Sequence, residues 1–300
     1  TTLFNIPGTV AETHMLKPYQ DRVKATYEYM KHSINFVDEN YLDISKKIME
    51  ELTNYLPNKK YAIRWKLDST KYSFIDFKGY EAGKKPSEIS GKPRLFYDRN
   101  KPFTRKVKFF DTYKADKEIV IPSYYVIPKS EGKIIENLKR NQIQFKELHS
   151  DSLITVESYK IVDFKTVKNP YEGHYLHFDT QVSSELKTKK FRKGDYLVST
   201  KQSGVKFLLE TLEPEAVDSY FNWNFFDGIL GQKEYFSDYV FEDTAAELLK
   251  TNKALKTAFE LKKASDAKFA EDGAAQLDWV YKNSEYYEGT VNQYPIYRIR

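Results

Sequence analysis

Apolar residues in the first 57 positions recur every three or four residues. One stripe follows Pro18 and contains Val23, Tyr27, Met30, Ile34 and Val37. A second stripe follows Asp43 and contains Ile44, Ile48, Leu52 and Leu56. This spacing is typical of helices that bury one face, while Pro18 suits a first helical turn and Asp43 suits an N-cap. We therefore expect two helices here, the second ending at Pro57.

From Lys59 onward, apolar and polar residues alternate, as they do in half-buried strands. Strands are predicted over residues 61–67, 72–74, 107–109, 119–121, 153–162 and 174–178. Two strand–glycine–helix units begin at Tyr124 and Tyr196, each with a glycine eight residues later. Residues 79–93 are expected to form a long loop or an extended edge, and residues 183–190 a charged hairpin loop.

The last third of the chain is helical in pattern again. Thr244 and Glu247 have the spacing of a capping box, and helical stretches follow over 254–263 and 267–281 before a final strand over 294–299. The predicted fold class is α+β, with a helical N-terminal stub, a strand-rich central region with strand–helix units, and a helical C-terminal segment with a returning final strand. The predicted domains are 1–57 and 58–300, the latter divided into a strand-rich part (58–241) and a mostly helical part (242–300).

Composition narrows the classes of protein. With 24 Tyr and 20 Phe in 300 residues, the chain is too aromatic to be disordered. The absence of Cys excludes disulfides, thiolate metal sites and Cys nucleophiles, so only His, Asp and Glu remain as metal ligands. No window of about 18 apolar residues occurs, so we expect no membrane span.

Charge is concentrated in one block. Residues 58–110 carry 15 Lys and Arg against 5 Asp and Glu, interleaved with aromatic residues, although the whole chain carries only +5. Proteins that bind single-stranded nucleic acid combine these features. Strands with lysines on their solvent face give the same pattern. The second interpretation is favoured, and no nucleic-acid partner is expected.

The histidines and the common catalytic motifs give little positive chemistry. None of the five histidines belongs to a His-x-x-Glu or His-Glu-x-x-His motif. His174 and His177 would face opposite sides of a strand, so we expect no metal site in this chain. Nucleophile elbows, phosphate loops and dinucleotide fingerprints are absent.

The most aromatic segment is Asn-Trp-Asn-Phe-Phe-Asp at residues 222–227. Such a cluster forms either a stacking platform for a sugar or a base, or an aromatic plug in the core. The plug is the favoured interpretation, since aromatic side chains of this size dominate core burial.

Several segments resemble a bacterial branch of the zinc carboxypeptidase family. Glu12-Thr-His-Met-Leu-Lys-Pro-Tyr19, followed by Arg22, Val23 and residues 25–27, is similar to the end of the catalytic domain. The long C-terminal extension of those proteins is similar to residues 171–174, 212–227, 241–249, 277–281 and 294–298. The resemblance thus covers nearly the whole chain.

The resemblance implies that Glu12 corresponds to the general base of the intact parent enzyme, which would activate a zinc-bound water. The family's zinc ligands and carboxylate-binding Arg precede this Glu and have no counterpart here. It therefore implies a C-terminal accessory region that holds neither metal nor cofactor and is inactive alone. Its partners would be the missing N-terminal peptidase domain and, in the parent, a peptide substrate; its location would be secreted or periplasmic.

An alternative function stays open. The chain would then be a non-catalytic module that binds carbohydrate or peptidoglycan fragments through the Tyr-rich surface of its strand region.

Overall fold

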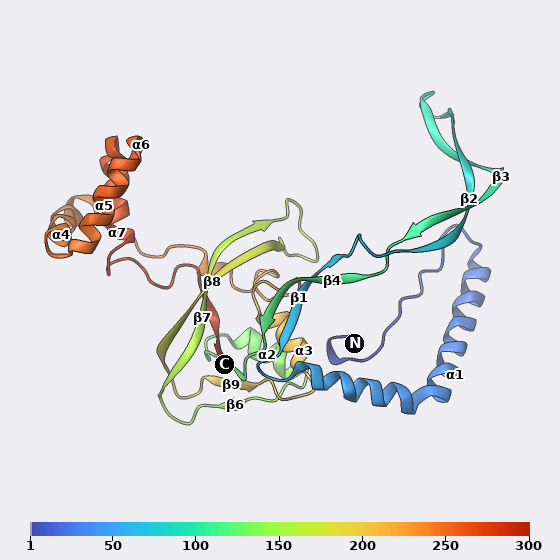
Figure 1. Ribbon diagram of the computed structural model, residues 1–300, viewed down its shortest axis with the longest axis horizontal. Coiled ribbons are helices and arrows are strands. Elements are labelled where there is room, and N and C mark those ends of the chain that lie inside the picture. The colour runs from blue at the N-terminus through green and yellow to red at the C-terminus, as the bar shows by residue number, and fades with distance from the viewer. Residues whose placement is uncertain (1) are drawn as a thin grey trace. The chain divides into compact units, whose positions relative to one another are not determined.

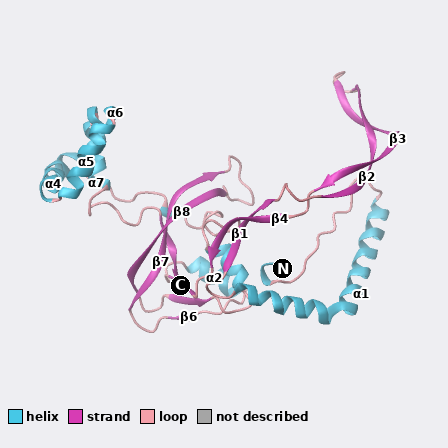
Figure 2. Cartoon of the chain, in the orientation of Figure 1, coloured by secondary structure: helices cyan, strands magenta, loops and turns pink. Residues whose placement is uncertain are grey.

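The computed structural model describes residues 2–300 and confirms the mixed α+β class (Figures 1 and 2). The chain divides into two compact units. One contains the residues up to Lys59 together with Val120–Arg300, and the other is Lys60–Ile119. The boundary expected at residue 57 separates the end of a peptidase domain from its extension, and the one at residue 241 divides that extension. Both stay predictions.

A single long helix replaces the two expected near the N-terminus. After η1 (Thr2–Phe4), α1 (Tyr19–Leu52) runs without a break through Asp43 to η2 (Thr53–Tyr55). The prediction of a second helix capped by Asp43 is wrong because Tyr41 continues the apolar stripe across the expected gap. Asp43 lies within the helix, 3.9 Å from the Lys47 ammonium one turn later.

The middle of α1 carries two side chains that bond back to the preceding turn. Ser33 Oγ donates to the carbonyl of Tyr29, and Asn40 Nδ2 donates to the carbonyl of Phe36, both at 2.8 Å. Such bonds compete with the backbone ladder and bend helices. Figure 1 shows that α1 bends between two nearly straight arms.

The smaller unit consists of two pairs of strands. β1 (Lys60–Leu67) pairs with β4 (Tyr113–Val120), and β2 (Ser73–Pro86) pairs with β3 (Pro93–Phe109) in a long antiparallel hairpin. Residues 79–93 were expected to form a loop or an extended edge, but most of them belong to these paired strands. Gly79 and Gly83 lie opposite Phe103 and Phe96, whose rings occupy the space that a Cβ would take.

The larger unit contains a six-stranded sheet in the order β6-β9-β5-β10-β7-β8. Its strands are β5 (Tyr124–Ile127), β6 (Lys146–Glu147), β7 (Ser152–Thr166), β8 (His177–Phe191), β9 (Tyr196–Ser199) and β10 (Gln293–Ile299). The returning final strand β10 lies between β5 and β7 and is antiparallel to both. The predicted hairpin loop over 183–190 is wrong, because these residues pair with β7. Of their charged side chains, Glu185 and Lys190 are exposed and Lys187 and Lys189 are half-buried.

The sheet is buried at its centre. Tyr125, Val126 and Ile127 of β5 are each 0% exposed, so both faces of this strand are covered. Val126 packs in one cluster with Val156, Phe191 and Tyr297. The predicted strand–helix units are present, since α2 (Gly132–Arg140) follows β5 and α3 (Val205–Leu212) follows β9. Both helices bury an apolar face.

Four helices precede β10 and have a core of their own. They are α4 (Asp238–Thr251), α5 (Lys253–Ser265), α6 (Ala267–Glu271) and α7 (Gly273–Lys282). Phe241 is buried in this core beside Tyr281. The predicted capping box is wrong, because α4 begins at Asp238 and Thr244 therefore lies inside the helix rather than at its N-cap. Among the described residues, no helix is long and apolar enough to cross a bilayer.

The link between β8 and β9 depends on one glycine. Gly194 has φ of +89°, a conformation that residues with a Cβ rarely adopt, and its N–H bonds to the carbonyl of Leu148 at 2.9 Å.

We expect Gly194→Ala to lower the free energy of unfolding by about 1–2 kcal/mol, measured by urea denaturation. Gly132→Ala is the control, since Gly132 opens α2 and no atom lies within 4 Å of the place a Cβ would take. Equal midpoints for both variants would contradict this account.

Candidate functional site

Glu12 lies in the extended segment between η1 and α1 and is exposed. Its neighbours make local contacts: Thr13 Oγ1 lies 2.9 Å from Thr26 Oγ1, and His14 Nδ1 accepts a hydrogen bond from the backbone N–H of Leu16. Across residues 2–300, no three His, Asp or Glu side chains are grouped to hold a metal ion. The role of Glu12 stays a prediction.

The aromatic segment 222–227 is divided between core and surface. Asn222 and Phe226 are each 4% exposed, whereas Phe225 is 37% exposed and Trp223 is half-buried. Phe226 packs edge-on against Tyr294 of β10. The core-plug interpretation therefore describes one half of the segment, and the other half presents aromatic rings at the surface.

Two segments far apart in the sequence meet at these rings. Residues 171–174 form a tight turn in which Tyr171 and His174 exchange backbone hydrogen bonds at 2.9 Å. The His174 ring lies edge-on to Trp223, with centroids 5.4 Å apart, and parallel to Phe225 at 6.2 Å. His174 precedes β8, so the predicted strand begins three residues too early; Gly173, with φ of +80°, turns the chain there.

His177, the first residue of β8, lies between a hydroxyl and a carboxylate. Its side chain is 5% exposed, its Nδ1 lies 2.9 Å from Thr166 Oγ1, and its Nε2 lies 3.2 Å from Asp227 Oδ1. A carboxylate can only accept from a neutral ring, so Asp227 favours the tautomer with the proton on Nε2. Nδ1 is then the acceptor for the Thr166 hydroxyl.

This order of groups is that of a nucleophile, a base and a carboxylate that orients the base. Asn224 Nδ2 also lies 3.2 Å from His177 Nε2 and donates to the carbonyl of Tyr175 at 2.8 Å. Phe164 and Phe221 cover the imidazole, so the buried ring joins β7, β8 and the 222–227 segment. The contacts support a structural role in holding these segments together.

A second polar cluster is buried in the sheet and centres on Arg298 of β10. Arg298 lies opposite Glu157 of β7 and Tyr125 of β5, so the three side chains share one face. Arg298 Nη1 donates to Glu157 Oε2 at 2.5 Å and also to the Tyr159 hydroxyl. Glu213, directly after α3, places Oε1 3.0 Å from Arg298 Nε as an ion pair and accepts a hydrogen bond from Tyr125 at 2.5 Å.

Burial dominates the electrostatics of this cluster. It raises the pKa of the Glu213 carboxyl above its usual range, while Arg298 and the Tyr125 hydroxyl act in the opposite direction. Burial and the Glu213 carboxylate raise the pKa of the Tyr125 hydroxyl well above 10. Burial lowers the pKa of Arg298, but the surrounding carboxylates and phenols raise it by more. The net pKa is raised, so the guanidinium stays charged. The Arg298 guanidinium is thus the fixed charge of the cluster, and the Tyr125 phenol beside it keeps its proton.

Neither cluster was predicted from the sequence. A partial signal existed for the second, because Arg298 is the one charged residue of the predicted final strand, and a buried charge there needs a partner such as Glu157 in another predicted strand. No local spacing connects them, since 141 residues separate the two.

The basic block forms an open surface in the smaller unit. Arg105 lies over the Phe103 ring at 4.1 Å, and Lys108 lies over the Tyr72 ring at 4.3 Å. Its strands carry their lysines and many of their aromatic side chains on exposed positions. A hollow of about 390 Å³ lies at the register shift of the hairpin and is lined by Lys78, Gly79, Tyr80, Pro102, Phe103 and Thr104.

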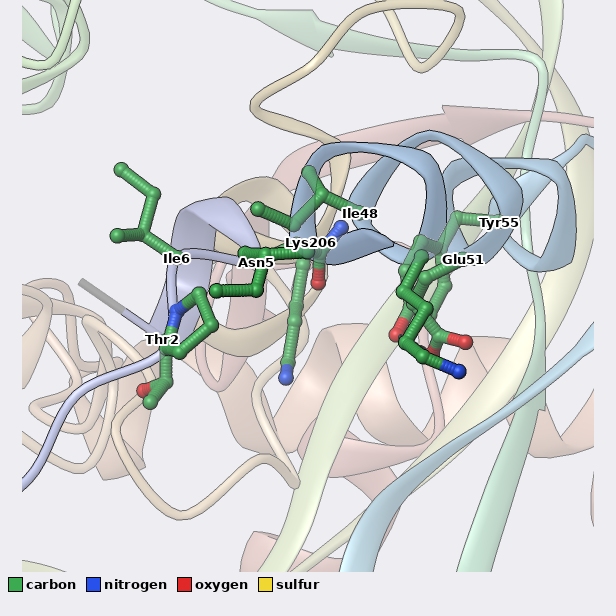
Figure 3. Close-up of a pocket in the computed structure, with 10 residues that line it drawn as sticks. Thr2, Asn5, Ile6, Ile48, Glu51, Tyr55 and Lys206 are labelled. Atoms are coloured by element: carbon green, nitrogen blue, oxygen red, sulfur yellow. Dashed lines mark hydrogen bonds between the residues drawn. The ribbon is translucent and has the colours of Figure 1, made fainter. Parts of the chain in front are cut away.

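Another hollow, of about 380 Å³, lies between the N-terminal segment and the end of α1 (Figure 3). Ile6 and Ile48 line it, with Lys206 of α3 and Glu51 among its polar groups. The Tyr55 hydroxyl donates to Glu51 at 2.5 Å, and burial together with that carboxylate raises the pKa of the phenol. The lining is mainly apolar, and Glu51 is engaged within the chain.

A long apolar surface belongs to α1, none of whose residues is buried. Eight residues alternate at spacings of four and three along one face: Val23, Tyr27, Met30, Ile34, Val37, Tyr41, Ile44 and Ile48. The first six are 49–66% exposed. We call this set the α1 stripe.

Comparisons with protein-family models, curated proteins and solved structures give no match for this chain.

The Arg298 cluster gives a pH-dependent prediction. Arg298→Met leaves the Glu157 and Glu213 carboxylates without their buried cation, so we expect the free energy of unfolding to fall by about 3–5 kcal/mol at pH 7.5. Because burial keeps the pKa of Glu213 raised, the folded variant takes up a proton as pH falls toward 4.5, and the loss relative to wild type shrinks. Urea denaturation at several pH values measures both.

Arg300→Met is the matched control, because Arg300 also bonds Glu157 at 2.5 Å but its side chain is 58% exposed. We expect it to cost less than about 1 kcal/mol. A loss from Arg298→Met that is small, or that does not vary with pH, would contradict the role given to this cluster.

Proposed function

We propose that this chain is the C-terminal accessory region of a zinc carboxypeptidase-like metallopeptidase, and that it docks on the peptidase domain through the α1 stripe. In this proposal the parent protein, secreted or periplasmic, trims peptides from their C-terminus. Zinc and substrate belong to the peptidase domain, and Glu12 supplies the general base once that domain is present.

The single observation that carries the proposal is the exposed α1 stripe. Monomeric proteins rarely leave apolar patches of this extent open to water. Burying a Val, Ile or Met side chain contributes about 1.5–3 kcal/mol, so covering the stripe would stabilise the helix substantially. An isolated helix gains most of its stability from packing of its apolar face.

The position of the stripe favours a peptidase domain as the covering partner. The segment that resembles the end of a catalytic domain, Glu12 to Tyr27, leads directly into α1 and includes the first two stripe residues. The last helix of a domain buries one face against that domain. A membrane surface fits less well, because α1 carries seven acidic and five basic residues, whereas helices on anionic membranes are basic.

The first test measures metal and activity. We expect the purified chain to hold no stoichiometric zinc by mass spectrometry and to trim no C-terminal residue from model peptides. A protein that also carries the residues encoded upstream of Thr1 should do both. Zinc and trimming in the chain alone would overturn the assigned inactivity, and their absence in the longer protein would overturn the peptidase assignment.

The second test addresses the docking face in the longer protein. Ile34→Glu with Tyr41→Glu should raise hydrogen exchange along α1 and lower thermal stability, because the charges would enter the buried contact. Ala25→Glu with His32→Glu, on the opposite face of α1, is the matched control and should change neither. Equal exchange in the two double variants would refute docking through the stripe.

Carbohydrate binding by the smaller unit is a second candidate, favoured by the exposure of its aromatic residues. Trp65, Phe77 and Tyr97 are 50–62% exposed, and Tyr80 lines the hollow in the hairpin. A glycan array gives the measurement: binding should be lost in Tyr80→Ala. The absence of any bound glycan would remove this candidate.

A further inference from the structure

A group of aromatic rings on the larger unit is exposed although the loops that carry it are fixed. Tyr171 is 60% exposed and Phe225 is 37% exposed, and His174 and the half-buried Trp223 complete the group. The rings are contiguous, since the Tyr171 and Trp223 centroids lie 6.4 Å apart and His174 contacts both Trp223 and Phe225. We call these four residues the aromatic platform.

The backbone beneath the aromatic platform is held from inside. Asn222 Oδ1 accepts from the Thr180 hydroxyl at 2.7 Å, and its Nδ2 donates to the carbonyl of Ala216 at 2.8 Å. The Asn222 carbonyl accepts from the N–H of His177, and Asn224 donates to the carbonyl of Tyr175. Aromatic side chains on a fixed support lose little conformational entropy when a ligand binds.

Polar acceptors border the rings. Asp218 Oδ1 accepts from the indole N–H of Trp223 at 3.3 Å. The Asp227 side chain is 51% exposed, and its Oδ1 is engaged by His177 and Asn224, whereas its Oδ2 has no hydrogen-bond partner within residues 2–300. Glu172 lies in the turn between Tyr171 and His174 and is exposed.

We propose that the aromatic platform is a binding site for a neutral pyranose sugar. The C–H face of a pyranose ring packs on an aromatic face, which carries negative potential because of the ring's quadrupole. The hydroxyls at the edge of the sugar donate hydrogen bonds to carboxylates such as Asp227. The phosphates of a nucleic acid or the carboxylates of an acidic glycan would meet Asp218, Asp227 and Glu172 with like charge. The acceptors therefore select an uncharged ligand rich in hydroxyl donors. This site is separate from the hairpin of the smaller unit and does not depend on the peptidase assignment.

Trp223 provides a direct readout of the site. The chain has three Trp residues, so Trp65→Phe with Trp279→Phe leaves Trp223 as the only indole. We expect cellohexaose or the hexamer of N-acetylglucosamine to change its fluorescence in a saturable way, with calorimetry on the wild-type chain giving the same Kd. Heparin, an anionic glycan, should leave the signal unchanged.

Substitutions at exposed positions then locate the site. Tyr171→Ala and Phe225→Ala should each weaken binding about tenfold or more, since each removes one stacking surface. Tyr239→Ala, at an α4 position that is 84% exposed, is the matched control and should bind as wild type. Far-UV circular dichroism checks that every variant is folded.

Two results would overturn the proposal: no saturable heat or fluorescence change with either oligosaccharide at millimolar concentration, or unchanged affinity in both Tyr171→Ala and Phe225→Ala. Failure of this proposal would leave the zinc and trimming tests unaffected, because those depend on Glu12 and the α1 stripe.

Discussion

The larger unit depends on one buried charge. Arg298 lies on the central strand β10, and its guanidinium joins Glu157 of β7 and Glu213 after α3, while Tyr125 of β5 bonds the same Glu213. Each of these ions is costly to remove from water, and the cost is offset only when all of them are in place. The cluster therefore fixes the register of three strands and the end of one helix together, a specificity that apolar contacts alone would not impose.

Elements with strong local periodicity were predictable from sequence, whereas their extent was decided by contacts that sequence does not display. The strand–helix units beginning at Tyr124 and Tyr196 follow from local pattern. Asp43 has the chemistry of a cap, but the apolar stripe on both sides of it outweighs that preference and α1 continues. The charged residues 183–190 have the composition of a loop, yet pairing with β7 makes them strand.

The candidate sites show the same limit. The aromatic segment 222–227 was conspicuous in the sequence, whereas residues 171–174 were singled out only by the family resemblance and His174 was predicted to begin a strand. Only the fold brings Trp223 and His174 into contact and separates exposed rings from buried ones. The Thr166, His177 and Asp227 cluster and the Arg298 cluster join residues far apart in the chain. A single sequence shows that these residues are polar but does not show which of them contact one another. Their pairing could therefore not be predicted.

The place of β10 at the centre of its sheet also constrains the order of folding. Every other strand of the sheet precedes it in the sequence, and its neighbours β5 and β7 cannot be bridged until residues after 292 are available. Contacts of this sequence separation slow folding, because a long loop must close before they form. The helices α4–α7, with a separate core, lie within that loop and shorten the disordered span by folding locally. Until β10 inserts, the facing edges of β5 and β7 are open to pairing with other chains, which makes this interval the one in which the protein is most exposed to misassembly.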